Sequence, residues 1–317
     1  MNNLVTERQA TVRFSIPFFK PRAYINLAVL RLVAVSWSLF HLFYNVPSRL
    51  EEALALPTEV YMPLPVLQVL LLPTGMEMPS ALGVMIIYWI TVVFGLSGLI
   101  GFRTNLSLLI FAVGNIFLQA FMYSFQDMHH PEAVMMIALL ALSLSPCGRM
   151  WSIDAVGGKG FNIWVDSRAA DDKRSPFAAW PILLIQIFFA LMYLSAVLSK
   201  HYYSGFEWAN GFTLQAVLIQ DGMRHNSPLA LWLSQFHYFI WGLQIVVMTF
   251  QATFWLVIFF PRLRWVYLPL GLAFHLGIEL AIKATFLHWI FLYVVFVPWD
   301  KVAEIYSGKR RWTQLFS

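Results

Sequence analysis

The sequence predicts an all-α integral membrane protein, a polytopic bundle of about eight transmembrane helices with both termini in the cytoplasm. Three observations support this fold class. Hydrophobic residues make up 59% of the 317 residues, charged residues make up 12%, and the mean hydropathy is +0.67, whereas a soluble domain carries about 25% charged residues. Apolar segments long enough to cross a bilayer recur along the chain. The basic residues gather in alternate loops between these segments.

Eight apolar segments are candidates for the spans. In chain order they cover residues 24–46, 80–100, 105–124, 131–147, 179–199, 238–260, 265–283 and 284–299. The fourth and eighth segments are short, and the seventh and eighth have a weak boundary because little more than KATFLH separates them. The segment 63–73 (PLPVLQVLLLP) is too short to span and is bracketed by prolines, so we interpret it as a re-entrant or interfacial piece.

The distribution of Lys and Arg predicts the orientation of the bundle. Residues 1–22 are charged and lack the apolar core of a cleavable signal peptide, so we expect the first apolar segment to be a retained span. With eight spans, sixteen of the 21 basic residues fall on the side of the N-terminus, which is then cytoplasmic: Arg8, Arg13, Lys20, Arg22, Arg103, Arg149, Lys159, Arg168, Lys173, Arg174, Arg262, Arg264, Lys301, Lys309, Arg310 and Arg311. The opposite side holds Arg49, Lys200, Arg224 and Lys283, and Arg31 lies within the first span. Seven spans would place the C-terminal basic run outside.

We interpret residues 1–317 as a single membrane domain. Its polar parts are a cytoplasmic N-terminal segment (1–22), a cytoplasmic loop (148–178), an external loop (200–237) and a cytoplasmic tail (300–317). The external loop contains WANGFTLQAVLIQ and SPLALWLSQFHYF, which are typical of short amphipathic helices at a membrane interface. The net charge of +5 does not indicate nucleic-acid binding, because the basic residues are sorted by membrane side. The expected partner is therefore membrane lipid, and no nucleic acid is expected. The single cysteine excludes an internal disulfide and a cysteine-based metal cluster.

Polar side chains within the spans mark a candidate site, because polar groups in hydrocarbon usually face a bundle interior or a cavity. Gln186, Tyr193 and Lys200 are spaced by seven and form a polar stripe along the fifth span. His275 and Glu279 share one helix face with Lys283, so the glutamate can pair with either neighbour. Together these residues predict a polar cavity that opens to the external side, lined by the fifth and seventh spans and the start of the fourth.

Lys200 has two interpretations. It can be a helix end-cap that extends its charge to the lipid headgroups. It can also be a base, because a lysine removed from water loses stability in its charged form, and the free amine is then available near neutral pH. His275 likewise can be a hydrogen-bonding contact between helices, and we expect the same of His41 and Asn45. No histidine pair or carboxylate cluster has metal-binding spacing, so no metal site is predicted.

Three segments resemble one family: MHHPEAVMMIALLALSLSPCGRMWSIDA (128–155), LLIQIFFALMYLSAVLSKHYYSGFEWANG (183–211) and LAFHLGIELAIKATFLHWIFLYVVFVPWD (272–300). They resemble, in order and spacing, the membrane domain of vitamin K-dependent gamma-carboxylases and their short prokaryotic relatives, the horizontally transferred transmembrane (HTTM) proteins. The most informative features are WSxD after the fourth span, Y-x-x-A-x-x-x-K followed by W-x-x-G at the fifth, and F-H in the seventh. The resemblance covers about residues 20–300.

The resemblance implies an activity. In the family, dioxygen oxygenates a reduced quinone after a lysine has acted as the base, and the strong base that results takes a carbon-bound proton from a peptide glutamate, to which carbon dioxide adds. Lys200 falls on the position of this lysine, His130 on an active-site histidine, and His275 on the F-H histidine. We therefore expect these three residues to be catalytic, and we expect a set of quinone-binding residues that consists of Tyr193, Gln186, Glu279, Trp208 and His129.

The sequence also departs from the family. The carboxylases have a double lysine, whereas Ser199 precedes Lys200, and they carry a large external β-rich region that is not found before Ser317. Short HTTM proteins resemble instead the sporulation-delaying-protein B family, which matures a bacterial peptide toxin. The first hypothesis is thus a quinol-dependent oxygenase, epoxidase or carboxylase-like lyase in a bacterial inner membrane, with its mouth facing the periplasm. The second is a non-redox maturation or export factor for a small secreted peptide, acting with a small soluble partner. A transporter ranks last, because no inverted repeat is visible.

Overall fold

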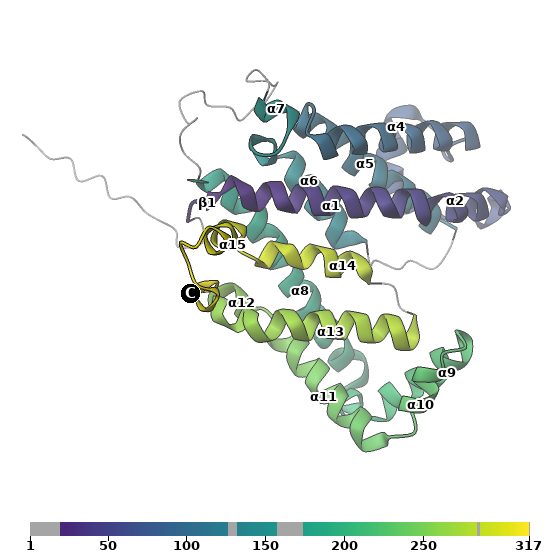
Figure 1. Cartoon of the computed structure of the whole chain (residues 1–317). Helices are drawn as coiled ribbons and strands as arrows, with labels where there is room; N and C mark the ends of the chain where they lie inside the picture. The colour runs from purple at the N-terminus through teal and green to yellow at the C-terminus, as the bar shows by residue number, and fades with distance from the viewer. Residues whose placement is uncertain (1–19, 126–131, 157–173, 284–285, 317) are drawn as a thin grey trace, which may run out of the picture.

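The computed structural model describes residues 20–125, 132–156, 174–283 and 286–316, and this part of the chain is almost entirely helical (Figure 1). The α-helices are α1 Tyr24–Tyr44, α2 Val46–Ala55, α3 Pro65–Leu71, α4 Ala81–Ile100, α5 Thr104–Tyr123, α6 Ala133–Ser143, α7 Ile153–Val156, α8 Ala179–Ser204, α9 Phe212–Arg224, α10 Pro228–Leu233, α11 His237–Thr253, α12 Leu256–Phe259, α13 Arg264–Ile282, α14 Leu287–Leu292 and α15 Trp299–Tyr306. Short 3₁₀ helices include η4 Cys147–Arg149, η6 Glu207–Ala209 and η8 Tyr293–Phe296. Two short strands, β1 Arg22–Ala23 and β2 Arg174–Ser175, pair antiparallel with Arg22 opposite Ser175.

Five of the described helices are long and apolar enough to cross a membrane: Tyr24–Tyr44, Ala81–Ile100, Thr104–Tyr123, Pro176–Ser204 and Pro261–Ile282. Shorter apolar helices occupy Pro65–Thr74, Ala133–Ser143 and Leu287–Phe296. The prediction of an all-α membrane protein is therefore confirmed, while the count of eight spans and the side of the termini stay predictions. The segment 238–260, expected as one span, forms two helices, α11 and α12, separated by a turn at residues 254–255.

The helices form a bundle in which α1 is central (Figure 1). α1 packs against α4, α6 and α14, and α4 and α5 pack against each other. α8 connects the two halves of the bundle, because it contacts α6 on one side and α11 on the other. At one end of the bundle, α9 and α10 form a small separate layer that packs on α11 and α13 through a cluster of Leu218, Ala230, Ile240 and Ala281. The site described below lies between α8, α11 and α13.

Glycines allow α4 and α5 to approach closely. A Cβ atom at Gly114 of α5 would lie 2.0 Å from Thr91 Oγ1 of α4, and a Cβ atom at Gly95 of α4 would lie 2.5 Å from the Phe111 ring of α5. Small residues at such contacts are typical of membrane helices, which associate through close packing because the lipid chains are as apolar as the helix surfaces.

The segment after α6 is fixed to the bundle by two charged side chains. Arg31 of α1 is fully buried and donates hydrogen bonds to the carbonyls of Cys147 (3.1 Å) and Trp151. Asp154, the aspartate of the WSxD motif, accepts hydrogen bonds from the backbone N–H groups of Arg103 (3.0 Å) and Thr104 (2.7 Å). These donors lie at the first turn of α5, where a helix has no internal acceptors, so Asp154 caps α5. The motif thus has a structural role at the end of the bundle where β1 lies.

We expect Asp154→Ala to lower the free energy of unfolding by about 1 kcal/mol, because the first backbone N–H groups of α5 lose their acceptor. The measurement is the thermal unfolding midpoint of the purified protein in detergent, compared with wild type. Glu77→Ala, which removes an exposed acid outside any helix, is the matched control. Equal midpoints for the two variants would contradict the capping role.

Candidate functional site

The polar stripe of α8 is confirmed as a row of side chains that contact three different neighbours. Lys200 contacts α11, Tyr193 contacts α13 and η8, and Gln186 donates a hydrogen bond to the carbonyl of Val295 in η8 at 2.8 Å. The spacing of seven residues corresponds to two helical turns, so the three side chains succeed each other along one side of α8 at intervals of about 10 Å. This helix therefore carries polar groups from its middle to its end at residue 204.

Lys200 is partly buried, and its ammonium group is turned toward neutral partners. Nζ donates a hydrogen bond to Gln251 Oε1 of α11 at 3.1 Å and lies 5.4 Å from the centroid of the Trp208 ring in η6. Nζ also lies 3.5 Å from the Ala196 carbonyl of its own helix. Within the described residues, no carboxylate lies within ion-pair distance of this amine. An amide and an aromatic face thus hold the side chain in one orientation. No negative charge among the described residues stabilises its protonated form.

The Tyr193 hydroxyl is the centre of a buried hydrogen-bonding node. It lies 2.6 Å from His275 Nε2 of α13 and 2.6 Å from the Tyr293 hydroxyl of η8. The three side chains are 2–4% exposed. A phenol has one proton, so Tyr193 can donate to His275 Nε2 while it accepts from Tyr293. Gly271 makes the approach of η8 to α13 possible, because a Cβ atom there would lie 2.0 Å from the Tyr293 hydroxyl.

Three polar atoms around this node have no hydrogen-bond partner among the described residues. They are His275 Nδ1, Trp289 Nε1 and Glu279 Oε2, and each is buried. The ring centroids of His275 and Trp289 are 5.6 Å apart, and Glu279 lies one helical turn beyond His275 on α13. Buried polar atoms are nearly always paired, so a group of them in one region is a candidate for binding polar atoms of a ligand.

The predicted pairing of Glu279 with a neighbour on α13 is not present. His275 Nε2 is directed to Tyr193, and the described residues show no ion pair between Glu279 and Lys283. The physical reason is that α13 ends at Ile282, and Lys283, the next residue, has a φ of 55° in the left-handed region, which takes it off the helical stripe. His129 and His130 lie outside the described residues, so their predicted roles stay predictions.

Sequence reasoning missed three residues of this region: Gln251, Trp289 and Tyr293. Gln251 had a signal, because it and Gln244 are spaced by seven in an otherwise apolar run, as Gln186 and Tyr193 are on α8. Trp289 and Tyr293 had none, because aromatic residues occur throughout the chain and make up 17% of it. By contrast, His41 does form an interhelical contact, with its ring 4.6 Å from that of His288.

We expect Tyr193→Phe to lower the free energy of unfolding by about 1 to 3 kcal/mol, because the buried His275 and Tyr293 groups lose the atom that pairs them. The measurement is unfolding of the detergent-solubilised protein by heat or by added denaturing detergent. Tyr202→Phe is the control, since Tyr202 lies on the same helix and is 83% exposed. If both variants unfold with wild-type midpoints, the node does not stabilise the bundle.

Comparison with known proteins identifies the family. No curated protein sequence and no solved structure gives a significant match. A family model described as the HTTM domain matches residues 68–300, which contain all the site residues described above. This family is associated with the vitamin K-dependent carboxylases. The chain therefore belongs to the HTTM domain family and is a carboxylase-like membrane protein.

Proposed function

We propose that the protein is a membrane enzyme that oxidises a reduced quinone with dioxygen, and that Lys200 is the base that takes a hydroxyl proton from the quinol. One observation carries the proposal: Lys200 Nζ is held between Gln251 Oε1 and the Trp208 ring with no carboxylate partner in the described part of the chain. A bound quinol of the vitamin K or menaquinone type would supply the electrons and the proton.

The orientation of the Lys200 side chain favours its interpretation as a base over its interpretation as a helix end-cap. A lysine that anchors a helix end extends its ammonium group to water or to headgroups. Here the side chain is partly buried, and its amine is directed to α11, whereas the next residue, His201, is exposed. Gln251 and Trp208 fix the position of the nitrogen, and neither neutralises its charge. Such an amine can release its proton to solvent and then accept one from a substrate near neutral pH.

The surrounding residues fit an aromatic ring with polar oxygens. Trp208 presents its ring to Lys200 Nζ, while His275 Nδ1 and Trp289 Nε1 are buried polar atoms without partners among the described residues. In this proposal, His275 holds one quinol oxygen, and the hydrogen bond from Tyr193 fixes the orientation of its ring. Glu279 balances charge from the next turn of α13. His130, outside the described residues, is proposed to act with them.

The substrate from which the base generated in this reaction takes a proton is proposed to be a peptide or small molecule on the external side of a bacterial inner membrane. Carbon dioxide is a further substrate if a carboxyl group is formed. Lys200 lies four residues before the end of α8, and η6, which follows α8, packs against α9 and α11. Its position therefore supports a mouth at the end of the bundle that carries α9 and α10 (Figure 1). This is the side that holds few basic residues in the predicted topology.

The second candidate is a non-redox maturation or export factor for a small secreted peptide. The observation that favours it is the surface of α9 and α10, which leaves large apolar side chains exposed, among them Phe212, Met223 and Trp232. An exposed apolar surface of this kind can dock a peptide or lie in the membrane interface. On this hypothesis Lys200 would be an end-cap, so the experiment that tests the first proposal also distinguishes the two.

The test is quinol oxidation by the purified protein in lipid nanodiscs, with reduced menaquinone, ubiquinone or vitamin K and dioxygen, corrected for oxidation without protein. Wild type is expected to oxidise one of these quinols and form its epoxide. We expect Lys200→Ala to lower the rate at least ~100-fold, a typical contribution of a catalytic base. His201→Ala is the matched control, since it removes a neighbouring exposed basic side chain and is expected to retain the rate.

The Lys200→Arg variant distinguishes a role of Lys200 as a base from a role as a helix end-cap. Arginine keeps a positive charge and can donate to Gln251, but it does not lose its proton at neutral pH. We therefore expect Lys200→Arg to be as inactive as Lys200→Ala. Full activity of Lys200→Arg would overturn the role of Lys200 as the base. No oxidation of any quinol by folded wild type would favour the maturation factor.

A further inference from the structure

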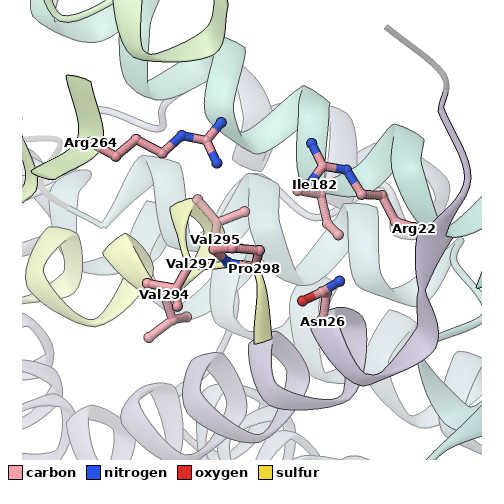
Figure 2. Close-up of a pocket in the computed structure, with 8 residues that line it drawn as sticks. All are labelled: Arg22, Asn26, Ile182, Arg264, Val294, Val295, Val297 and Pro298. Carbon is pink, nitrogen blue, oxygen red and sulfur yellow. The ribbon is translucent and has the colours of Figure 1, made fainter. Parts of the chain in front are cut away.

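A second polar region lies at the opposite end of α8, around a small cavity that is partly open to solvent; its empty space, counted together with that open part, is about 240 Å³. Figure 2 shows two arginines on either side of it: Arg22 from β1 and Arg264 from the start of α13, each with its guanidinium group directed toward the space between them. Between the arginines the wall is formed by residues from α1, α8, η8 and the chain just after η8, among them Asn26, Ile182, Val295 and Pro298. The quinone site proposed above uses none of these residues.

Arg264 brings a buried positive charge to this cavity. The residue is 4% exposed, and its guanidinium group donates hydrogen bonds to the carbonyls of Val257 (3.1 Å) and Phe296 (2.9 Å). The described residues provide no carboxylate within ion-pair distance of it. A buried arginine keeps its charge, and backbone carbonyls only partly offset the loss of hydration, so such a group favours an anion nearby.

Arg22 brings a second positive charge, and the acid shown near it among the described residues, Asp300, is already engaged. Burial lowers the pKa of Arg22, with Asp300 raising it and Arg174 lowering it. The two oxygens of Asp300 accept from Asn26 Nδ2 (3.2 Å) and from Arg174 (2.7 Å). Among the described residues, Asp300 is the acid that acts on Arg22, and it is already shared by Asn26 and Arg174.

Just beyond the cavity, the described residues place a lysine and an arginine–glutamate ion pair. The pKa of Lys301 is lowered by burial and then by the positive charge of Arg310, while Asp300 raises it and Arg22 and Arg264 lower it further. The nearby acid, Glu304, already pairs with Arg310 at 2.7 Å. Among the described residues, Arg22 and Arg264 line the cavity, and the nearby Asp300 is already engaged by Asn26 and Arg174.

We propose that this cavity binds a phosphate group, presented by an anionic phospholipid headgroup or by a soluble phosphate compound. Two arginines that converge from different elements suit phosphate, because each guanidinium can offer paired N–H donors to its oxygens. The apolar wall of Ile182, Val294 and Val297 suits the glycerol and first acyl carbons of a lipid. Basic pockets between transmembrane helices on the cytoplasmic side bind such headgroups in other proteins.

The site is independent of the quinone chemistry. Ile182 and Lys200 both lie on α8, eighteen residues apart, which corresponds to about 27 Å along the helix. Loss of phosphate binding would therefore leave the proposed activity of Lys200 unaffected, and an inactive Lys200 variant would still bind phosphate. The two proposals can fail separately.

The test is lipid binding to the full-length protein in detergent, measured by native mass spectrometry and by the thermal unfolding midpoint. The probes are dioleoylphosphatidylglycerol, zwitterionic dioleoylphosphatidylcholine and inorganic phosphate. Arg22→Gln removes one charge from the cavity, and Arg22→Lys keeps the charge without the paired donors. Arg262→Gln is the matched control, because Arg262 lies two residues from Arg264 at the same end of the bundle but is exposed.

We expect wild type and Arg262→Gln to retain phosphatidylglycerol more strongly than phosphatidylcholine. Arg22→Gln should weaken phosphatidylglycerol binding by about five-fold, the typical contribution of one basic residue, and Arg22→Lys should weaken it less. If inorganic phosphate instead raises the midpoint of wild type but not of Arg22→Gln, the site holds a soluble phosphate compound. The proposal is overturned if neither phosphate source binds wild type selectively, or if Arg22→Gln and Arg262→Gln weaken binding equally.

Discussion

The hydrogen bonds of the Tyr193 hydroxyl are the interaction on which the second half of the bundle depends. In a hydrocarbon environment a polar group has no water to bind, so each one must find an internal partner. Tyr193 satisfies this requirement for His275 and Tyr293 at once, and it thereby fixes α8, α13 and η8 relative to each other. The absence of a side chain at Gly271 is part of the same arrangement, because any Cβ atom would displace the Tyr293 hydroxyl.

Four charged side chains described above lie within the bundle in different settings. Arg31 donates to backbone carbonyls and Asp154 accepts from backbone N–H groups, and the two side chains hold the segment after α6 against α1 and α5. Arg264 also donates to backbone carbonyls, but it lines the cavity proposed to bind phosphate, and Lys200 donates to the side-chain amide of Gln251. Neutral partners thus hold all three cations, Arg31, Lys200 and Arg264, in place.

Part of this arrangement could be predicted from the sequence. The all-α membrane fold follows from apolar segments, and the spacing of Gln186, Tyr193 and Lys200 correctly places them along one helix. The partners of these residues could not be predicted, because Gln251 and Tyr293 reach them from distant segments, and periodicity within one helix carries no information about contacts between helices. The two cavity arginines were counted only as part of the cytoplasmic charge, since composition does not distinguish an arginine in a loop from one directed into a cavity.

The position of Cys147 has a practical consequence. It is the single cysteine of the sequence, it is 1% exposed, and its Sγ atom donates to the carbonyl of Leu142 at 3.3 Å. A thiol reagent therefore has little access to it in the folded protein. The wild-type chain already provides a background in which one cysteine at a time can be introduced and labelled from either side of the membrane. Such labelling would map the number of spans and the side of each loop without altering any native residue of the core.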